Sequence, residues 1–373
     1  MRISILQGAF LPVPPIRGGA IEKAWDHLGT EFVKLGHEVT HVSKLCDGLP
    51  EEETRSGVRH LRVSGANAVS SPWLMKALEL PYLLRAKKVL PEADVLVTHT
   101  FWAPLLLSSQ RFGKLYVHVG RYPKGQMRLY RRAERLQAPS SSVRNAILRE
   151  VPGSEDSVTC QPYPLPWVQP PYRSYGERSR KVLFLGRIHP EKGVLELVRA
   201  WGRLNPIHKQ NWHLKIKGPW EKKHGGAGSH YLNKVKQAAR ETEARIEIEE
   251  PSFNENELSK ELQDARIFAY PSLAEKGETF GLAVLEAMSC GCVPLVSDLG
   301  CFTDFLENDS NALVFSRNSE NEKSLSQVLL WALENQEDLE PMSSRAYQRA
   351  SLFSLEKVAR GYLQDFDDMV NVP

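Results

Sequence analysis

Two glutamates, Glu278 and Glu286, stand eight positions apart in the segment ETFGLAVLE, on either side of Phe280-Gly281-Leu282. The apolar spacing after Gly281 predicts an amphipathic helix that ends at Gly291, which places both acids near a helix N-terminus. Backbone N–H groups in a first helical turn have no intrahelical partner, and with the helix dipole they attract phosphate. A carboxylate would repel phosphate but can bind hydroxyls, such as those of a sugar. The alternative is an ordinary helix with a solvated glutamate.

A second candidate cluster is the segment GRIHPEKG, from Gly186 to Gly193. It follows a strand-like run, so it should lie at the carboxyl edge of a parallel sheet, where α/β folds bind ligands. Arg187 offers a forked set of donors and Lys192 a compact positive charge, and both suit a diphosphate. The alternative is a surface turn that carries two charges.

The first half of the chain holds weaker candidates. Gly18 and Gly19 stand at the predicted start of the first helix, where glycine lets the backbone approach a phosphate closely. They do not form a GxGxxG fingerprint, which counts against chemistry with a nicotinamide dinucleotide. His99 and His118 each follow a short apolar strand, where an imidazole could bind a sugar hydroxyl. A purely structural role is the alternative for both histidines.

The elements that must position these residues follow the same plan in both halves of the chain. The first half has strand-like runs at 2–7 and 38–43 around a helix that starts at about 19 and ends at Gly36, then a helix at 72–90 and strands at 95–98 and 115–119. The second half has strands at 181–186, 212–218, 245–248, 267–270 and 293–297, with helices at 231–240 and 255–264. Two helices, at about 323–335 and 354–368, close the chain. The Pro-rich segment 163–175 is typical of a linker. Repeated βαβ units predict an α/β fold of two doubly wound Rossmann-like domains.

The two motifs together resemble those of the retaining glycosyltransferases of family 4, which have the GT-B fold: two Rossmann-like domains that face each other across a cleft. The resemblance rests on the glutamate pair with Phe280-Gly281 after the first acid, on Tyr270-Pro271-Ser272 before it, and on Gly-Arg followed by Lys-Gly at 186–193. It is strong over about 180–315, moderate over 1–45 and 94–150, and absent over 46–93. It implies an acceptor-side domain at 1–165, a nucleotide-sugar donor domain at 166–355, and a C-terminal helix at 356–373 that packs back on the first domain.

The resemblance also implies roles for the candidate residues. Arg187 and Lys192 would neutralise the departing diphosphate, while Glu278 would hold the sugar hydroxyls. The implied catalytic residues are Glu278, Arg187, Lys192 and His118. The implied donor-binding residues are Gly18, Gly19, Arg187, Lys192, Gly218, Thr279, Phe280, Gly281, Leu282 and Glu286, the last at the ribose, and His99 and His118 would contact the sugar or the acceptor. No cofactor is expected beyond the nucleoside-diphosphate sugar itself, with UDP or GDP as its nucleotide.

The segment Asp365-Phe366-Asp367 resembles the DxD metal motif of the other glycosyltransferase fold. Here it falls in the closing amphipathic helix, far from any strand end. We interpret it as part of a solvated helix face. Since the resemblance implies that Arg187 and Lys192 supply the positive charge, no metal is expected.

Composition limits the classes of protein that fit. The 373 residues suffice for two domains, and 42% hydrophobic with 25% charged residues is typical of a soluble globular protein. No apolar run approaches the roughly 20 residues that span a bilayer, and the first residues lack the apolar core of a signal peptide. Five cysteines show no spacing of a disulfide framework or metal site, which favours a reduced, cytoplasmic setting.

Positive charge concentrates in the first half of the chain. Residues 1–165 carry 22 Lys and Arg against 15 Asp and Glu, and residues 111–135 alone carry eight against one. Such a stretch could face an anionic membrane, an acidic acceptor or nucleic acid, or be a solvated helix face. With the family resemblance, a peripheral contact of 111–135 with an anionic membrane is preferred, on the inner face of the plasma membrane, and no nucleic-acid partner is expected.

The sequence thus predicts a retaining glycosyltransferase that moves a sugar from a nucleoside-diphosphate sugar to a hydroxyl of a glycan, lipid-linked or small-molecule acceptor. Its expected place is the synthesis of cell-surface polysaccharide or glycoconjugate. One alternative is a nucleotide-sugar epimerase of the same fold, which would need acid and base side chains at the sugar but no second substrate. The other is a non-enzymatic two-domain sugar-binding protein of periplasmic type, which would need an export signal.

Overall fold

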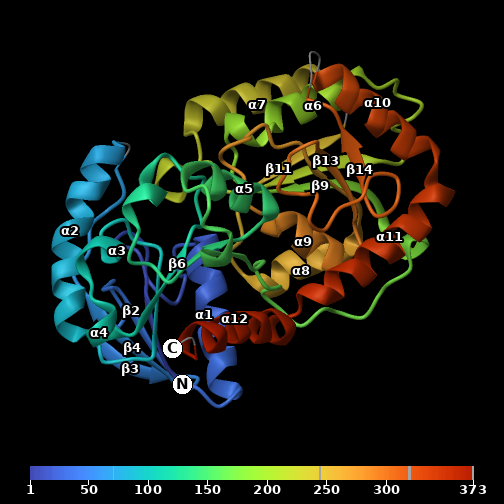
Figure 1. Cartoon of the computed structure of the whole chain (residues 1–373). Coiled ribbons are helices and arrows are strands. Elements are labelled where there is room, and N and C mark those ends of the chain that lie inside the picture. Colours follow the sequence, from blue (N-terminus) through green and yellow to red (C-terminus); the bar gives the residue numbers. More distant parts are fainter. Residues whose placement is uncertain (70, 243–244, 318–320, 372–373) are drawn as a thin grey trace. The chain divides into compact units, whose positions relative to one another are not determined.

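The computed structural model describes residues 1–69, 71–242, 245–317 and 321–371 (Figure 1). The chain divides into two compact units. Unit 1 holds Met1–Pro166 and Leu355–Pro373, and unit 2 holds Trp167–Ser354. Each unit is built on a mainly parallel sheet whose strands alternate with helices. The predicted α/β class with two Rossmann-like domains is therefore confirmed.

Unit 1 has a sheet with the strand order β3-β4-β2-β1-β5-β6-β7-β8, in which only β3 and β4 pair antiparallel. Its strands are β1 (Arg2–Leu6), β2 (Glu38–Lys44), β3 (Glu52–Arg55), β4 (Val58–Val63), β5 (Val95–Thr98), β6 (Lys114–His118), β7 (Arg135–Ala138) and β8 (Val158–Cys160). Its helices are α1 (Ala20–Lys34), α2 (Pro72–Val89), α3 (Ala103–Leu106), α4 (Ser109–Phe112), α5 (Ser141–Glu150) and α12 (Leu355–Val370). The central strands are buried apolar runs, as expected for a parallel sheet covered on both faces. The strand order reverses between β1 and β5, so ligands of such a sheet bind at the carboxyl ends of these two strands.

The closing helix α12 completes the core of unit 1. Phe366 packs edge-on against Phe32 and Tyr116, with ring centroids 5.8 and 4.9 Å apart. The neighbouring Asp365 Oδ2 accepts hydrogen bonds from the Tyr116 hydroxyl and from Thr159 Oγ1, both at 2.9 Å. The interpretation of Asp365-Phe366-Asp367 as a solvated face is therefore wrong for its first two residues, because the helix turns them towards the sheet. Asp367 alone is exposed.

Unit 2 has an all-parallel sheet with the order β11-β10-β9-β12-β13-β14. Its strands are β9 (Ser179–Leu185), β10 (His213–Lys217), β11 (Ile246–Glu249), β12 (Ala265–Tyr270), β13 (Val293–Ser297) and β14 (Leu313–Phe315). Its helices are α6 (Val194–Arg203), α7 (Ser229–Glu241), α8 (Glu255–Asp264), α9 (Leu282–Ser289), α10 (Asn321–Glu334) and α11 (Gln336–Ala350). In chain order the strands run 3-2-1-4-5-6, the doubly wound arrangement of dinucleotide-binding folds. The order reverses between β9 and β12, which again marks the ligand-binding edge.

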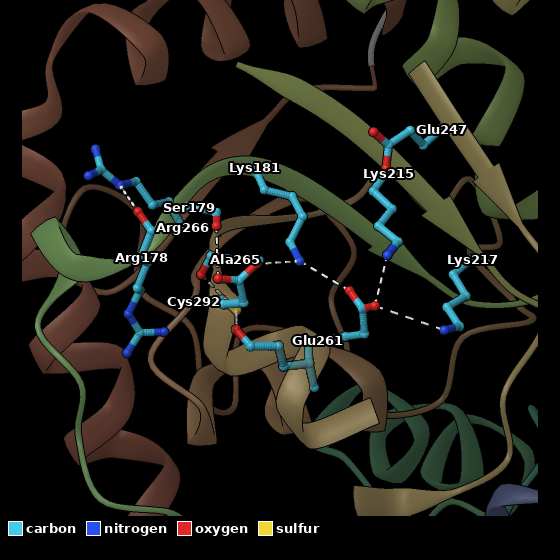
Figure 2. Close-up of polar contacts among 12 residues, drawn as sticks. Arg178, Ser179, Lys181, Lys215, Lys217, Glu247, Glu261, Ala265, Arg266 and Cys292 are labelled. Atoms are coloured by element: carbon cyan, nitrogen blue, oxygen red, sulfur yellow. Dashed lines mark hydrogen bonds and ion pairs between the residues drawn. The ribbon is translucent and has the colours of Figure 1, made fainter. Parts of the chain in front are cut away.

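One face of β10 in unit 2 carries Lys215 and Lys217 in place of apolar side chains, and Lys181 of the neighbouring β9 lies beside them (Figure 2). Glu261 of α8 joins all three: Oε2 pairs with Lys181 at 3.0 Å, and Oε1 with Lys215 at 2.8 Å and Lys217 at 3.9 Å. Asp264 also pairs with Lys181, at 3.0 Å. The helix is thus fixed to the sheet by ion pairs where a Rossmann fold more commonly uses apolar contacts.

Candidate functional site

The candidate site of unit 2 forms where the strand order reverses, at the carboxyl ends of β9 and β12. The loop after β9 contains the 3₁₀ turn Pro190–Lys192, whose start is capped by the His189 ring accepting the N–H of Glu191 at 3.3 Å. Gly193 follows with a φ of 67°, and a Cβ there would lie 2.0 Å from the carbonyl oxygen of Pro271. Only glycine permits this approach, which brings Lys192 against the loop after β12.

Lys192 and Glu278 meet in this site although 86 positions separate them. Lys192 Nζ donates to Glu278 Oε2 at 2.6 Å, and both side chains are nearly buried, at 7% and 11% exposed. The same carboxylate oxygen accepts hydrogen bonds from the Tyr270 hydroxyl at 3.1 Å and from Ser272 Oγ at 3.3 Å. The structure therefore brings together the lysine and the glutamate that the sequence predicts to be catalytic, and the catalytic role itself stays a prediction.

The groups around this pair keep the Lys192 side chain protonated and therefore positively charged. Burial alone would lower the pKa of the Lys192 ammonium, but Tyr270 and Glu278 beside it outweigh burial and raise that pKa above its ordinary value. Burial and the nearby Glu278 charge also raise the pKa of Tyr270, so its hydroxyl stays protonated and can donate. Lys192 thus remains a cation at neutral pH and can serve as a fixed positive charge.

Arg187 lies on the same loop and is also paired. One nitrogen, Nη2, donates to Glu191 Oε1 at 2.6 Å, and Nη1 donates to the carbonyl of Gly225 at 2.8 Å. Its side chain is 40% exposed, so the guanidinium can exchange these partners at low cost. Arg187 and Lys192, the two cations predicted to bind a diphosphate, therefore each form an ion pair with a carboxylate. A diphosphate could replace these carboxylates as the partner.

The start of α9 supplies backbone donors to the same edge. Gly281 is the N-cap in a left-handed conformation with a φ of 96°, and no side chain of the described residues caps the helix. A Cβ on Gly281 would lie 2.4 Å from the Phe302 ring. Phe280 is buried, with its ring centroid 5.2 Å from that of Phe305. Phe280 and Gly281 therefore anchor the helix start, and the N–H groups after them have the geometry of an anion site.

The remaining predicted residues of unit 2 differ in their structural setting. Glu286 lies one turn into α9 and is half-buried, as are Thr279 and Leu282. Gly218 follows β10, and a Cβ there would lie 1.8 Å from the carbonyl oxygen of Gly186. Glycine at 218 is thus required for the close packing of two backbones at the sheet edge, whatever its role toward a ligand.

In unit 1 the two predicted histidines differ in whether a ring nitrogen remains for a ligand to bind. The backbone N–H of Gly8 donates to His99 Nε2 at 3.0 Å, so the neutral ring carries its hydrogen on Nδ1. That Nδ1 is buried and has no hydrogen-bond partner among the described residues. Burial, with His118 and Arg121 nearby, lowers the pKa of His99 to about 3, so the ring is neutral. His99 therefore retains one donor that a ligand could use.

His118 uses both ring nitrogens within the fold. Its Nδ1 donates to Gln137 Oε1, and its Nε2 accepts from the Tyr163 hydroxyl at 2.8 Å. Burial lowers its pKa to about 4, and the bond to Gln137 only partly opposes this. Its predicted contact with a sugar stays a prediction, and a ligand would have to displace Tyr163 to make it.

The predicted glycines of unit 1 lie at the start of α1. Gly18 and Gly19 have φ values of 77° and 111°, and Gly19 is the N-cap. A Cβ on Gly19 would lie 2.2 Å from Glu22 Oε2, so a carboxylate occupies the space beside this helix start. Burial raises the pKa of Glu22. This carboxylate makes the turn a poorer phosphate site than its glycines alone would indicate.

The sequence-based prediction assigns no function to three residues of the unit 2 site, although they belong to its motifs: Tyr270, Ser272 and Glu191. The first two fix the Glu278 carboxylate, and Glu191 holds Arg187. Their position could have signalled them, since Tyr270 ends a strand and Ser272 begins the loop that leads to Glu278. Nothing in the sequence shows that Glu191 turns back onto Arg187.

A separate pocket of about 470 Å³ lies on the lysine face of unit 2, lined by Lys181, His213, Lys215, Lys217, Glu257, Lys260, Glu261 and Asp264. Burial opposes ionisation of Glu261, but hydrogen bonds from Lys215 and Lys181 outweigh it and lower the pKa of the carboxyl. Because the lysines at its centre already pair with carboxylates, we interpret this pocket as a structural network (Figure 2).

Comparison with known proteins shows similarity to glycosyltransferases. The family model described as "Glycosyl transferases group 1" matches residues 173–349, which include the whole unit 2 site. Over 202 residues the chain is 25% identical to the GDP-mannose:cellobiosyl-diphosphopolyprenol alpha-mannosyltransferase of Xanthomonas oryzae pv. oryzae, covering 52% of this chain and 48% of that protein. The chain spans about half the length of the curated relatives it matches.

Solved structures match over the full chain. Sucrose-phosphate synthase from Thermosynechococcus elongatus superposes with a TM-score of 0.77, covering 100% of both chains at 15% identity. The Anabaena protein Alr3699/HepE, in complex with UDP and glucose, superposes with a TM-score of 0.69 at 15% identity, covering 99% of this chain and 100% of that one. At this identity the likeness shows the fold, which is that of the GT-B glycosyltransferases.

Proposed function

With a group 1 glycosyltransferase domain at residues 173–349 as the premise, we propose that this chain is a retaining glycosyltransferase of family 4 type. It transfers a sugar from a nucleoside-diphosphate sugar to an acceptor hydroxyl. The observation that carries the proposal is the Lys192–Glu278 pair, held at 2.6 Å beside the start of α9. Cation, carboxylate and helix N-terminus are the three groups that a diphosphate linked to a sugar requires.

The mechanism follows from exchanging partners at this pair. When the diphosphate enters, Lys192 and Arg187 turn from their carboxylates to phosphate oxygens, and the N–H groups at the start of α9 add hydrogen bonds. Glu278 then accepts hydrogen bonds from the sugar hydroxyls in place of the ammonium, while Tyr270 and Ser272 keep it oriented. Each donor aimed at the departing phosphate could stabilise the transition state by about 3 kcal/mol.

Bond making and breaking need no covalent nucleophile from the protein. The bond between the anomeric carbon and the phosphate oxygen breaks, and the acceptor oxygen forms its bond on the same face of the sugar. The acceptor proton passes to the departing phosphate oxygen. Because the new bond forms on the face that the phosphate leaves, the anomeric configuration is retained. Lys192 and Arg187 balance the charge that develops on the diphosphate, so the proposal includes no metal ion.

Substrates are proposed from the relatives. One matching protein is named for GDP-mannose and a diphosphopolyprenol acceptor, and a matching structure holds UDP and glucose. We therefore expect UDP or GDP as the nucleotide, and a glycan or lipid-linked acceptor that binds unit 1, where the Nδ1 of His99 could bind a hydroxyl. A role in cell-surface polysaccharide or glycoconjugate synthesis, a cytoplasmic location and a peripheral membrane contact through 111–135 belong to the same proposal.

The first test is thermal stabilisation by UDP, GDP, ADP and dTDP, each with and without magnesium. A nucleotide at 100 times its dissociation constant stabilises the folded state by about 2.7 kcal/mol. We expect UDP or GDP to raise the unfolding temperature most, to the same extent with and without magnesium. No shift with any nucleotide would contradict the donor site, and a shift that needs magnesium would contradict the metal-free mechanism.

A further inference from the structure

Helix α2 of unit 1 carries apolar side chains on both of its faces. Its inner face packs Tyr82 and Leu83 into the core, both at 0% exposed. Its outer face exposes Trp73, Leu74 and Leu84, at 79%, 49% and 52%. A surface helix of a globular protein normally has a polar outer face. The packing of the core of unit 1 accounts for the inner residues but not for an apolar outer face.

The exposed residues of α2 gather on one side of the helix, here called the α2 face. At about 100° per residue, Trp73, Ala77 and Leu84 line up, Leu74 lies farther round the exposed side, and Val89 lies at its edge. Two cations, Arg85 and Lys88, complete the α2 face, which comprises Trp73, Leu74, Ala77, Pro81, Leu84, Arg85, Lys88 and Val89, all exposed. This is a contiguous apolar strip and not a scatter of single residues, and such patches mark interaction sites.

Charge on α2 has a single sign at the surface. The helix carries Lys76, Arg85, Lys87 and Lys88, and its one acid is Glu79. Glu79 is buried, and its Oε1 accepts the backbone N–H groups of Phe101 at 2.6 Å and Trp102 at 3.1 Å. The solvent-facing side therefore combines an apolar strip with cations and offers no carboxylate.

The helix is held firmly in unit 1. Besides the two bonds to Glu79, Trp102 Nε1 donates to the carbonyl oxygen of Lys76 at 2.7 Å. Lys76 Nζ lies over the rings of Phe101 and Trp73, at 4.0 and 5.2 Å from their centroids. The α2 face is thus a preformed surface, which lowers the entropic cost of docking it on a partner.

Ring contacts connect helix α2 with the basic stretch of the sequence at 111–135. The Phe101 ring packs edge-on against Tyr130, with centroids 6.3 Å apart. Next to Tyr130, Leu129 is 53% exposed, and Arg131 and Arg132 follow it. Contacts through Lys76, Phe101 and Tyr130 thus connect Trp73 of α2 with the segment that carries the cations of 128–132.

We propose that the α2 face docks unit 1 on the surface of an anionic bilayer. Trp73, Leu74 and Leu84 would enter the boundary between headgroups and acyl chains, and the lysines and arginines would bind lipid phosphates, as in interfacial helices. No helix within the described ranges is long and apolar enough to cross a bilayer. A second copy of the chain is the poorer partner, because the exposed side of α2 carries cations and no carboxylate that could pair with them in a contact between two copies of this face.

This docking element goes beyond the proposed function, which names only the stretch 111–135. It also holds for unit 1 whether or not unit 2 transfers a sugar. The donor site of the proposed function is tested by nucleotide binding and the α2 face by lipid binding, so the donor site and the docking surface can fail separately.

The test is flotation with vesicles of phosphatidylcholine alone and of phosphatidylcholine mixed with phosphatidylglycerol. We compare the unaltered chain with Trp73→Ser/Leu84→Ser and with the control Trp331→Ser, which removes a 39% exposed tryptophan from α10. We expect the unaltered chain and the control to float with anionic vesicles. The double variant should bind at least about tenfold more weakly, because two exposed apolar anchors are lost.

Three further readouts keep the outcomes distinct. Thermal unfolding and nucleotide stabilisation should be the same in all three proteins, since the altered side chains are exposed. Binding that is equal in the double variant, or absent in the unaltered chain, overturns the proposal. If size-exclusion chromatography instead shows a dimer that Trp73→Ser/Leu84→Ser dissociates, the α2 face is a protein interface and the lipid proposal is wrong.

Discussion

At the scale of single residues, Lys192 is the group whose role can be tested most directly. It is nearly buried, it is charged, and its partner is the predicted sugar-binding glutamate. Replacing Lys192 by Met keeps most of the side-chain volume but removes the charge aimed at the diphosphate. We expect Lys192→Met to lower kcat about 100- to 1,000-fold, the usual cost of removing one preorganised donor. Steady-state transfer kinetics on the purified variant would measure it.

The same substitution leaves Glu278 buried with hydroxyl partners only. Breaking a buried pair in this way costs about 3 kcal/mol of stability, so the kinetics must be measured well below the unfolding temperature. Lys276→Ala is the matched control, because Lys276 lies in the same loop but is exposed. Turnover of Lys192→Met within twofold of that control would show that Lys192 only supports the fold.

At the scale of elements, one carboxylate of α8, that of Glu261, pairs with three lysines of the sheet. Glu261 faces Lys181, Lys215 and Lys217, and the Lys181 side chain is only 5% exposed. Glu261→Gln keeps the shape but leaves three ammonium groups with less compensating charge. We expect it to lower the free energy of unfolding by roughly 1–3 kcal/mol, measured by urea denaturation.

A control for this prediction lies one turn earlier on α8. Glu257 lines the same pocket but is exposed, and its Oε2 accepts a hydrogen bond from Ser252. Glu257→Gln should change stability by less than about 0.5 kcal/mol. If both variants unfold at the same urea concentration, the lysine face does not depend on Glu261 for stability.

Prediction of the elements from sequence succeeded where signals were local. Helix α8 has the predicted bounds, because an N-cap residue, Asn254, precedes it and a buried strand follows. Helix α11 was missed, since Pro341 stands inside it and breaks the expected pattern. Strands β7 and β8 were also missed, because runs of three or four strand residues give little periodicity to detect. Helix α5, which lies between them, was missed as well.

The site was predictable in its residues but not in their contacts. The motifs at 186–193 and 278–286 contain Lys192 and Glu278, yet the bond between them depends on β9 pairing with β12, two strands that are not consecutive. The same holds for Asp365, whose partners Tyr116 and Thr159 are more than 200 positions away. Sequence patterns reveal which face of an element is apolar, but not which distant hydroxyl will meet a carboxylate.

At the scale of the whole molecule, the chain leaves unit 1 at Pro166 and returns to it at Leu355. The core of unit 1 is therefore completed only when α12 arrives, after unit 2 has been synthesised. Until then the apolar surface of Trp25, Phe32 and Tyr116 lacks its cover. The folding of unit 1 thus depends on the last residues of the chain.

This dependence predicts that a single residue of α12 controls the stability of unit 1. Phe366 is fully buried, and truncating a buried phenylalanine costs about 3–5 kcal/mol. We expect Phe366→Ala to destabilise unit 1 by that amount, while Asp367→Ala, at the exposed next position, changes stability by less than about 0.5 kcal/mol. Hydrogen exchange can report the two units separately: amides of β1 and β6 should lose protection, and those of β9 and β12 should keep it. Equal protection in both variants would mean that α12 covers unit 1 without stabilising it.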